Sequence, residues 1–152
     1  MSERDVLARF EAHLDPARPE AAPGVSIIGY GEVSTVFALA ELPGRVCKRM
    51  AGFRDAAAAA HYTATVQRYI DFLEAENVRV VETAVLPIER RGRAPVVYVV
   101  QAQLASEGLG NEVLHCADDP ALRARIDAVL LRIGRLLRSN RERRDGRSVT
   151  VD

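Results

Sequence analysis

The chain is poor in cysteine, in net charge and in long apolar runs, and each shortage excludes a class of protein. Its two cysteines, Cys47 and Cys116, lie far apart and lack the paired spacing of a zinc site, which favours a reduced, cytoplasmic protein. The 21 basic and 21 acidic residues cancel, so no overall field attracts nucleic acid or a membrane. No stretch approaches the length of a membrane span, and the charged N-terminus is unlike a secretion signal.

Sequence patterns typical of metal-binding and nucleic-acid-binding sites are also missing. The histidines His13, His61 and His115 are scattered, with no cysteine or carboxylate at the spacing of a metal site. The arginine cluster at 141–147 contains no aromatic residue, so we interpret it as a solvated loop. We therefore expect no protein-bound metal and no nucleic-acid or membrane partner.

What remains is the composition of a globular protein, with 48% apolar and 28% charged residues among 152 positions. Helical periodicity, β-rich runs and turn residues alternate along the chain. They predict a helix from Ser2 to Asp15, strands at 25–28, 33–39 and 45–50, a helix at 55–76, strands at 78–88 and 95–104, and a helix at 119–140. This order predicts an α+β fold: a five-stranded antiparallel sheet with one bracing helix, an N-terminal helix and a C-terminal helix.

The same pattern divides the chain into three parts. Residues 1–23 hold the N-terminal helix and a Pro-rich linker, residues 24–104 the sheet with its helix, and residues 105–152 a connector and the last helix. Ser2 and Asp5 form a predicted capping box at the first helix. In the last helix, six apolar residues are predicted to face inward: Leu122, Ile126, Val129, Leu130, Ile133 and Leu137.

The stretch GYGEVSTVFAL, residues 29–39, joins two β-rich runs with almost no loop. Because glycine lacks a Cβ, the peptide N–H groups at Gly29 and Gly31 can approach phosphate oxygens that any side chain would hold away. The alternative is a tight hairpin whose glycines only supply positive φ angles. Lys48, 19 positions after Gly29, taken alone resembles an ordinary solvent-facing strand lysine, but together with the glycines it predicts a cradle for a polyphosphate.

In its order and spacing the sequence resembles the small lobe of the protein-kinase-like fold, especially that of aminoglycoside- and choline-phosphotransferase-like proteins. Gly29-Tyr30-Gly31-Glu32-Val33-Ser34 stands where that family has its glycine-rich loop. Arg45-Val46-Cys47-Lys48 stands where its third strand ends in a lysine, and Gln101-Ala102-Gln103-Leu104 falls at the hinge for adenine. The resemblance spans roughly Val25 to Asn140.

The resemblance implies that the chain binds ATP. The glycine-rich loop would hold the phosphates, Lys48 would reach the α and β phosphates, and Val36 would pack on the adenine. Ser34 replaces the family's third glycine, and its hydroxyl can donate to a phosphate. The implied nucleotide-binding residues are Gly29, Tyr30, Gly31, Ser34, Val36, Lys48, Gln101 and Gln103.

Few residues of this sequence correspond to the catalytic residues of the kinase-like family. The glutamate that braces the lysine would lie near the middle of 55–76, where Gln67, Asp71 and Glu74 are the nearest polar residues. Asp152 corresponds to the first residue of a catalytic loop, with no second carboxylate placed to hold Mg²⁺. We expect nucleotide binding without phosphoryl transfer by these residues alone; in a longer chain the resemblance implies Mg²⁺ and a small-molecule acceptor.

Two other hypotheses stay open. In the first, the fold persists without its ligand and serves as a non-catalytic interaction or dimerisation module. The helix at 119–140 is apolar at more positions than one small lobe could cover, which predicts either self-association as a homodimer or packing against a missing lobe. In the second, the chain is an unrelated α+β domain whose glycine turn is only a turn.

Overall fold

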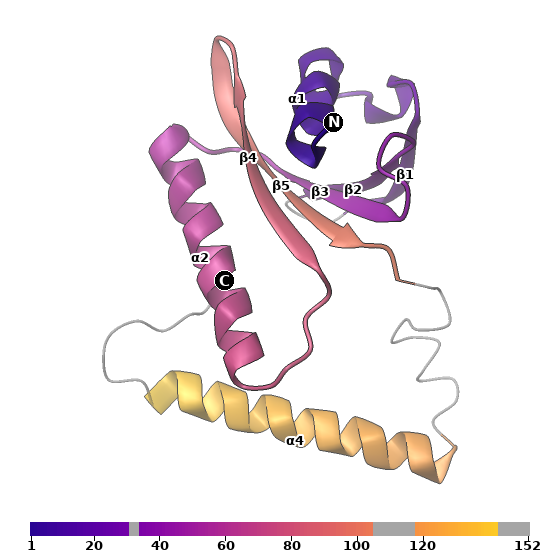
Figure 1. Ribbon diagram of the computed structural model, residues 1–152, viewed down its shortest axis with the longest axis vertical. Coiled ribbons are helices and arrows are strands. Elements are labelled where there is room, and N and C mark those ends of the chain that lie inside the picture. The colour runs from indigo at the N-terminus through magenta and orange to yellow at the C-terminus, as the bar shows by residue number, and fades with distance from the viewer. Residues whose placement is uncertain (31–33, 105–117, 143–152) are drawn as a thin grey trace. The chain divides into compact units, whose positions relative to one another are not determined.

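A computed structural model describes residues 1–30, 34–104 and 118–142, and it confirms the predicted α+β class (Figure 1). The elements are α1 (Glu3–His13), a short 3-10 helix (Pro19–Ala21), β1 (Val25–Tyr30), β2 (Ser34–Leu39), β3 (Arg45–Met50), α2 (Ala56–Ala75), β4 (Thr83–Arg90), β5 (Arg93–Ala102) and α4 (Pro120–Glu142). The five strands form one antiparallel sheet in the order β1-β2-β3-β5-β4. Met1–Gln103 and Leu104–Asp152 are two compact units, described separately below.

Helix α1 begins at the predicted capping box and packs on the sheet. The amide N–H of Asp5 donates to the Ser2 hydroxyl at 3.2 Å, and the amide N–H of Ser2 donates to the Asp5 carboxylate at 3.1 Å. These bonds satisfy amide groups that a helix start leaves without a partner. Val6 and Leu7 are buried in the main core cluster. The N-terminal helix therefore belongs to the same compact unit as the sheet.

The sheet has two faces, which alternation along each strand assigns residue by residue. The α1 face holds the core, where strand residues pack with Val6 and Leu7: Phe37, Leu39, Cys47, Val96, Tyr98 and Val100. The opposite face, here the α2 face, includes the buried Val97 and Val99. Helix α2 lies along β4 and β5 (Figure 1), while β1, β2 and β3 have no comparable contact with it.

Of the predicted boundaries that the structure moves, two bear on the sheet around the candidate residues. Helix α2 ends at Ala75, and Asn77 adopts a left-handed φ of 58°. The Val78 amide N–H then donates to the Leu73 carbonyl at 2.8 Å, which closes the helix, so β4 begins at Thr83 rather than at 78. Strand β1 extends through Gly29 to Tyr30, which places the first glycine inside the strand.

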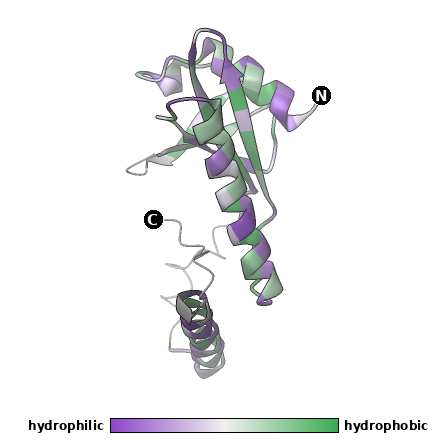
Figure 2. Ribbon diagram, turned by 90° about the vertical axis from the view of Figure 1, so that its left-hand side faces the viewer, coloured by the Kyte–Doolittle hydropathy of each residue, from purple (hydrophilic) through white to green (hydrophobic). Residues whose placement is uncertain are grey.

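Hydrophobic residues run along the central strands, whereas the helices mix hydrophobic and hydrophilic positions (Figure 2). Within the described residues, no helix combines the length and the apolar character needed to cross a membrane.

Candidate functional site

A β-bulge in β1 sets the position of Gly29. Ile27 pairs with Phe37 and Gly29 with Val36, so Ile28 is the extra residue between them. Val36 pairs in turn with Lys48 on β3. Gly29, Val36 and Lys48 therefore form one cross-strand row on the α2 face, and two strand spacings put about 10 Å between the backbones at its ends.

Lys48 is a half-buried cation on this row. Its strand neighbours Cys47 and Arg49 point to the α1 face, so Lys48 points to the α2 face. Val36 and Val99 are its cross-strand neighbours. Among the described residues, no hydrogen bond or ion pair holds its ammonium group, which leaves its three N–H donors available to a ligand.

Lys48 is distinguished from every other basic residue of the chain by its type. It is the only lysine, so the other twenty of the 21 basic residues are arginines. Lysine and arginine are not interchangeable: an ammonium is a compact point charge, whereas a guanidinium is a wide planar fork. Counting lysines and arginines separately would have singled out Lys48 in the sequence.

Gly29 does not have the backbone conformation that a structural glycine requires. Its φ lies outside the left-handed region, and a Cβ built on it meets no described atom within 4 Å. A glycine inside a strand destabilises the fold by roughly 0.5–1 kcal/mol relative to alanine. Neither the φ of Gly29 nor its described surroundings require a glycine, so the reading in which it only supplies a positive φ is wrong at this position.

The other predicted loop residues lie at the loop end of the sheet. Ser34 pairs with Met50 on the α2 face, one row beyond Val36. Tyr30, paired with Thr35, ends β1 and is 72% exposed. Gly31 lies outside the described residues.

The two predicted hinge residues lie at the other end of the sheet. Gln101 is half-buried and pairs with Val46 on β3 and with Thr83 on β4. Gln103 is exposed just after β5, and its amide N–H donates to the Gly44 carbonyl at 2.8 Å. The row of Gln101 is two residues along the strands from the row of Lys48.

No described acidic residue braces Lys48. The Gln67 amide donates to the Asp71 carboxylate at 2.9 Å, so these two candidates bond to each other on the exposed side of α2. Glu74 is exposed. In the described part of the chain, no three histidine, cysteine or acidic side chains gather as a metal site. The predicted catalytic residue Asp152 lies outside the described residues.

A cluster around Glu11, on the α1 face, was not predicted. Glu11 is 3% exposed and accepts two hydrogen bonds from Arg49, at 2.6 and 2.9 Å. Arg90 donates to the same carboxylate at 3.0 Å, and the Tyr98 hydroxyl donates to it as well. The sequence did contain a signal for this cluster: Glu11 lies one helical turn after Leu7, so a charged residue stands on the apolar side of the helix.

The cluster shifts the pKa values of its members. Burial by itself would raise the pKa of Glu11, but the hydrogen bonds from Arg49 and Tyr98 and the positive charges of Arg49 and Arg90 outweigh it, so this pKa lies below its ordinary value. Burial, followed by the nearby charge of Glu11, raises the pKa of Tyr98. Glu11 is therefore ionised in the folded protein and fixes α1 to the sheet.

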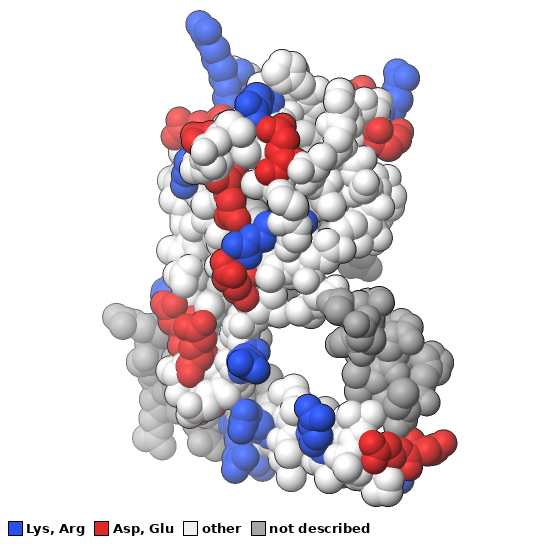
Figure 3. Space-filling model, turned by 45° about the vertical axis from the view of Figure 1, so that its right-hand side comes forward, with Lys and Arg blue, Asp and Glu red and all other residues white. Residues whose placement is uncertain are grey.

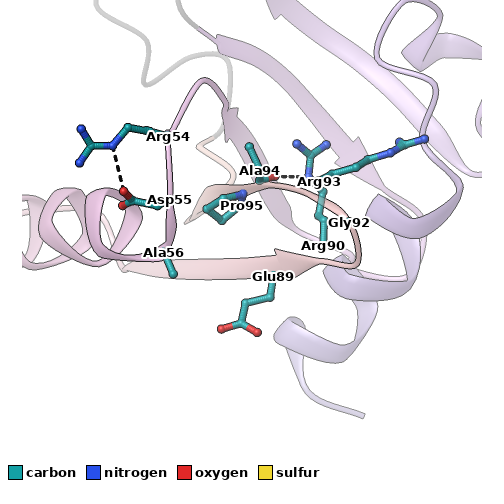
Figure 4. Close-up of a pocket in the computed structure, with 9 residues that line it drawn as sticks. All are labelled: Arg54, Asp55, Ala56, Glu89, Arg90, Gly92, Arg93, Ala94 and Pro95. Carbon is teal, nitrogen blue, oxygen red and sulfur yellow. Dashed lines mark hydrogen bonds and ion pairs between the residues drawn. The ribbon is translucent and has the colours of Figure 1, made fainter.

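A hollow of about 550 Å³ lies between the start of α2 and the β4–β5 hairpin, away from Lys48 (Figure 4). Two of its arginines are already paired: Arg54 donates to Asp55 at 2.9 Å, and Arg90 donates to the Ala94 carbonyl at 2.6 Å. On the face that Figure 3 shows, acidic and basic side chains of the first unit are interspersed. In neither feature is there a cation like Lys48, which has no partner among the described residues, so we place the candidate site at the Lys48 row.

One family model matches the chain, over residues 10–148, and it is described as a family of unknown function (DUF6206). No curated protein and no solved structure gives a significant match.

Proposed function

The chain belongs to the family of unknown function DUF6206, and we propose from the geometry of its α2 face that it binds ATP. One observation carries the proposal: the only lysine of the chain lies, without a described partner, in the same cross-strand row as a glycine that the described fold does not require. A cytoplasmic location, favoured by the two distant cysteines, is part of this proposal.

The chemistry of the row suits a polyphosphate. Main-chain N–H groups at the end of β1 can meet phosphate oxygens because Gly29 has no side chain in the way. Lys48 adds a compact positive charge, and a hydrogen bond to a charged group contributes about 1.5–3 kcal/mol. Val36, between them on β2, offers an apolar surface.

The arrangement also supports the resemblance to a kinase-like small lobe, which remains part of the proposal. That resemblance requires the lysine strand to neighbour the strand leading to the hinge, and β3 does pair with β5. The described residues do not gather as a site for Mg²⁺. We therefore derive no phosphoryl-transfer step and no small-molecule acceptor from them.

The single lysine permits a direct test. An amine-reactive acetylating reagent can modify only Lys48 and the N-terminal amine, and mass spectrometry separates the two peptides. We expect millimolar ATP or inorganic tripolyphosphate to slow acetylation of Lys48 while leaving the N-terminus unaffected. Equal rates with and without both ligands would refute the proposal.

Thermal denaturation gives an independent measurement. A ligand at ten times its Kd stabilises the folded state by about 1.4 kcal/mol, which raises Tm by several degrees. Lys48→Ala should abolish this rise and leave Tm in the absence of ligand nearly unchanged, because no described hydrogen bond or ion pair is lost. Lys48→Arg is the matched control: it keeps the charge but changes its shape, so we expect a weakened rise.

Helix α4 favours a second function, association with another copy of the chain. Apolar side chains of α4 that were predicted to face inward are exposed: Val129 by 56%, Leu130 by 59%, Ile133 by 43% and Leu137 by 63%. Exposed apolar surface of this extent on one helix is typical of interaction surfaces. We infer that the chain forms a homodimer through α4, independently of nucleotide binding.

A further inference from the structure

We propose that Thr83 fixes the orientation of the Gln101 side-chain amide, so that the site selects a base with an exocyclic amino group, such as adenine. The inference rests on the proposed nucleotide binding. Thr83 was not among the predicted site residues, and its role would be to position Gln101 rather than to touch the phosphates.

The sheet register brings Gln101 within reach of the same ligand as Lys48. Lys48 pairs with Val99, two residues before Gln101 on β5. Such diagonal neighbours on one face of an antiparallel pair lie about 7–8 Å apart. Both side chains are half-buried on the α2 face. A nucleotide whose phosphates meet Lys48 can therefore place its base beside Gln101.

The hydrogen bonds of the Thr83 hydroxyl allow only one orientation of the Gln101 side-chain amide. The Thr83 hydroxyl has one proton, which it donates to the Val81 carbonyl at 2.6 Å. It can then only accept from Gln101, so the atom that faces it at 3.0 Å must be the donor Nε2. Rotating the amide by half a turn would place Oε1 of Gln101 against the Thr83 hydroxyl oxygen, and these two acceptors would repel each other.

The fixed orientation determines what the ligand meets. With Nε2 directed to Thr83, the Oε1 oxygen is turned elsewhere, and no described residue donates to it. A carbonyl oxygen accepts from an exocyclic amino group, as glutamine does with adenine, but repels a carbonyl at the same position. Adenine has an amino group at this position of the ring, and hypoxanthine has an oxygen.

The test measures the affinities of the full chain for ATP, inosine triphosphate and inorganic tripolyphosphate by titration calorimetry. We expect ATP to bind about tenfold more tightly than inosine triphosphate. Thr83→Val, which keeps the β-branched shape, should bring this ratio close to one and leave tripolyphosphate binding unchanged. Thr83→Ser keeps the hydroxyl and should restore the ratio. Thr65→Val, which removes a threonine hydroxyl on α2, is the control.

Gln101→Met gives a second route in case Thr83→Val unfolds the protein. It removes the acceptor at similar length, and we again expect a ratio close to one. If the wild-type ratio is close to one, or if Thr83→Val preserves a tenfold ratio, the inference is wrong while tripolyphosphate binding keeps the proposed function intact. If neither tripolyphosphate nor ATP binds, both fail together.

Discussion

At the scale of single residues, Glu11 has the most demanding environment. Its carboxylate is buried beside two arginines and accepts a hydrogen bond from each. Removing one member of a buried ionic cluster leaves the other charges buried without compensation, which typically costs 3–5 kcal/mol, roughly. We expect Glu11→Gln to lower the free energy of unfolding by about 3 kcal/mol, measured by urea denaturation. Glu41→Gln, in an exposed pair with Arg9, should lower it by less than about 1 kcal/mol.

The pH dependence of stability provides a separate check on Glu11. Because its folded pKa lies below the ordinary value of 4.5, its contribution is complete above that value and is lost as the pH falls through the folded pKa. The wild-type protein should therefore lose stability below pH 4.5 more steeply than Glu11→Gln does. Parallel curves for the two proteins would show that the carboxylate is not held as the structure describes.

Gly29 gives a prediction in which stability and binding change in opposite directions. Its φ suits any residue, and a Cβ there meets no described atom within 4 Å. Gly29→Ala should therefore stabilise the ligand-free protein by about 0.5–1 kcal/mol, since alanine loses less entropy in a strand. The added Cβ would lie where phosphate approaches, so tripolyphosphate binding should weaken. Gly44→Ala, at φ +72°, should instead cost about 1–2 kcal/mol without affecting binding.

At the scale of elements, much of the fold could be predicted from local patterns. The capping box of α1, the strand at 45–50 and the antiparallel α+β class are all confirmed. Local patterns wrongly extended a strand over 78–82, because the Val78–Leu73 hydrogen bond that closes α2 depends on the left-handed Asn77. They also missed the Glu11 cluster, since Arg49 and Arg90 reach Glu11 from distant parts of the chain.

The residues of the candidate site could be predicted from the order of the strands, but their arrangement in space could not. Lys48 and Gly29 were found from their spacing, but the row that joins them depends on the bulge at Ile28, which the sequence does not reveal. The Thr83–Gln101 bond depends on the pairing of β4 with β5. Pairings between strands distant in sequence need tertiary structure, which one sequence does not display.

Chemical modification can test whether Cys47 and Lys48, neighbours on β3, lie on opposite faces of the sheet. Cys47 belongs to the buried core, and burial raises the pKa of its thiol to about 12. Lys48, the next residue, faces the α2 face and is half-buried. In a Cys116→Ser chain at pH 8, we expect Cys47 to resist a disulfide-exchange reagent until the protein is unfolded. Lys48 should be acetylated in the folded state. Rapid thiol reaction of folded protein would mean that the two faces of β3 are exchanged.

At the scale of the whole molecule, the chain comprises the unit Met1–Gln103 and the unit Leu104–Asp152. The core cluster, the Glu11 network and the Lys48 row all belong to the first unit. The residues that carry the proposed nucleotide binding are all in this unit. Variants in α4 should leave protection of Lys48 by tripolyphosphate unchanged, which keeps the two proposed functions separable.

Within α4, a stripe of apolar residues follows spacings of four, three and four: Leu122, Ile126, Val129 and Ile133. Leu136 and Asn140 continue this spacing but are already buried. This is the heptad pattern of a helix that packs against another helix. A second copy of α4 supplies the same stripe. We therefore expect the chain to sediment as a dimer at micromolar concentration.

Two substitutions in the stripe should separate the copies. Val129→Lys with Ile133→Lys puts charges where the partner helix would pack, and lysine favours helix formation more than valine does. We expect a monomer in sedimentation velocity with unchanged helical circular dichroism. Leu131→Lys is the matched control, because Leu131 is 67% exposed but lies off the stripe, and it should remain a dimer. A double variant that still sediments as a dimer, or a wild-type monomer, would show that the stripe does not join two copies.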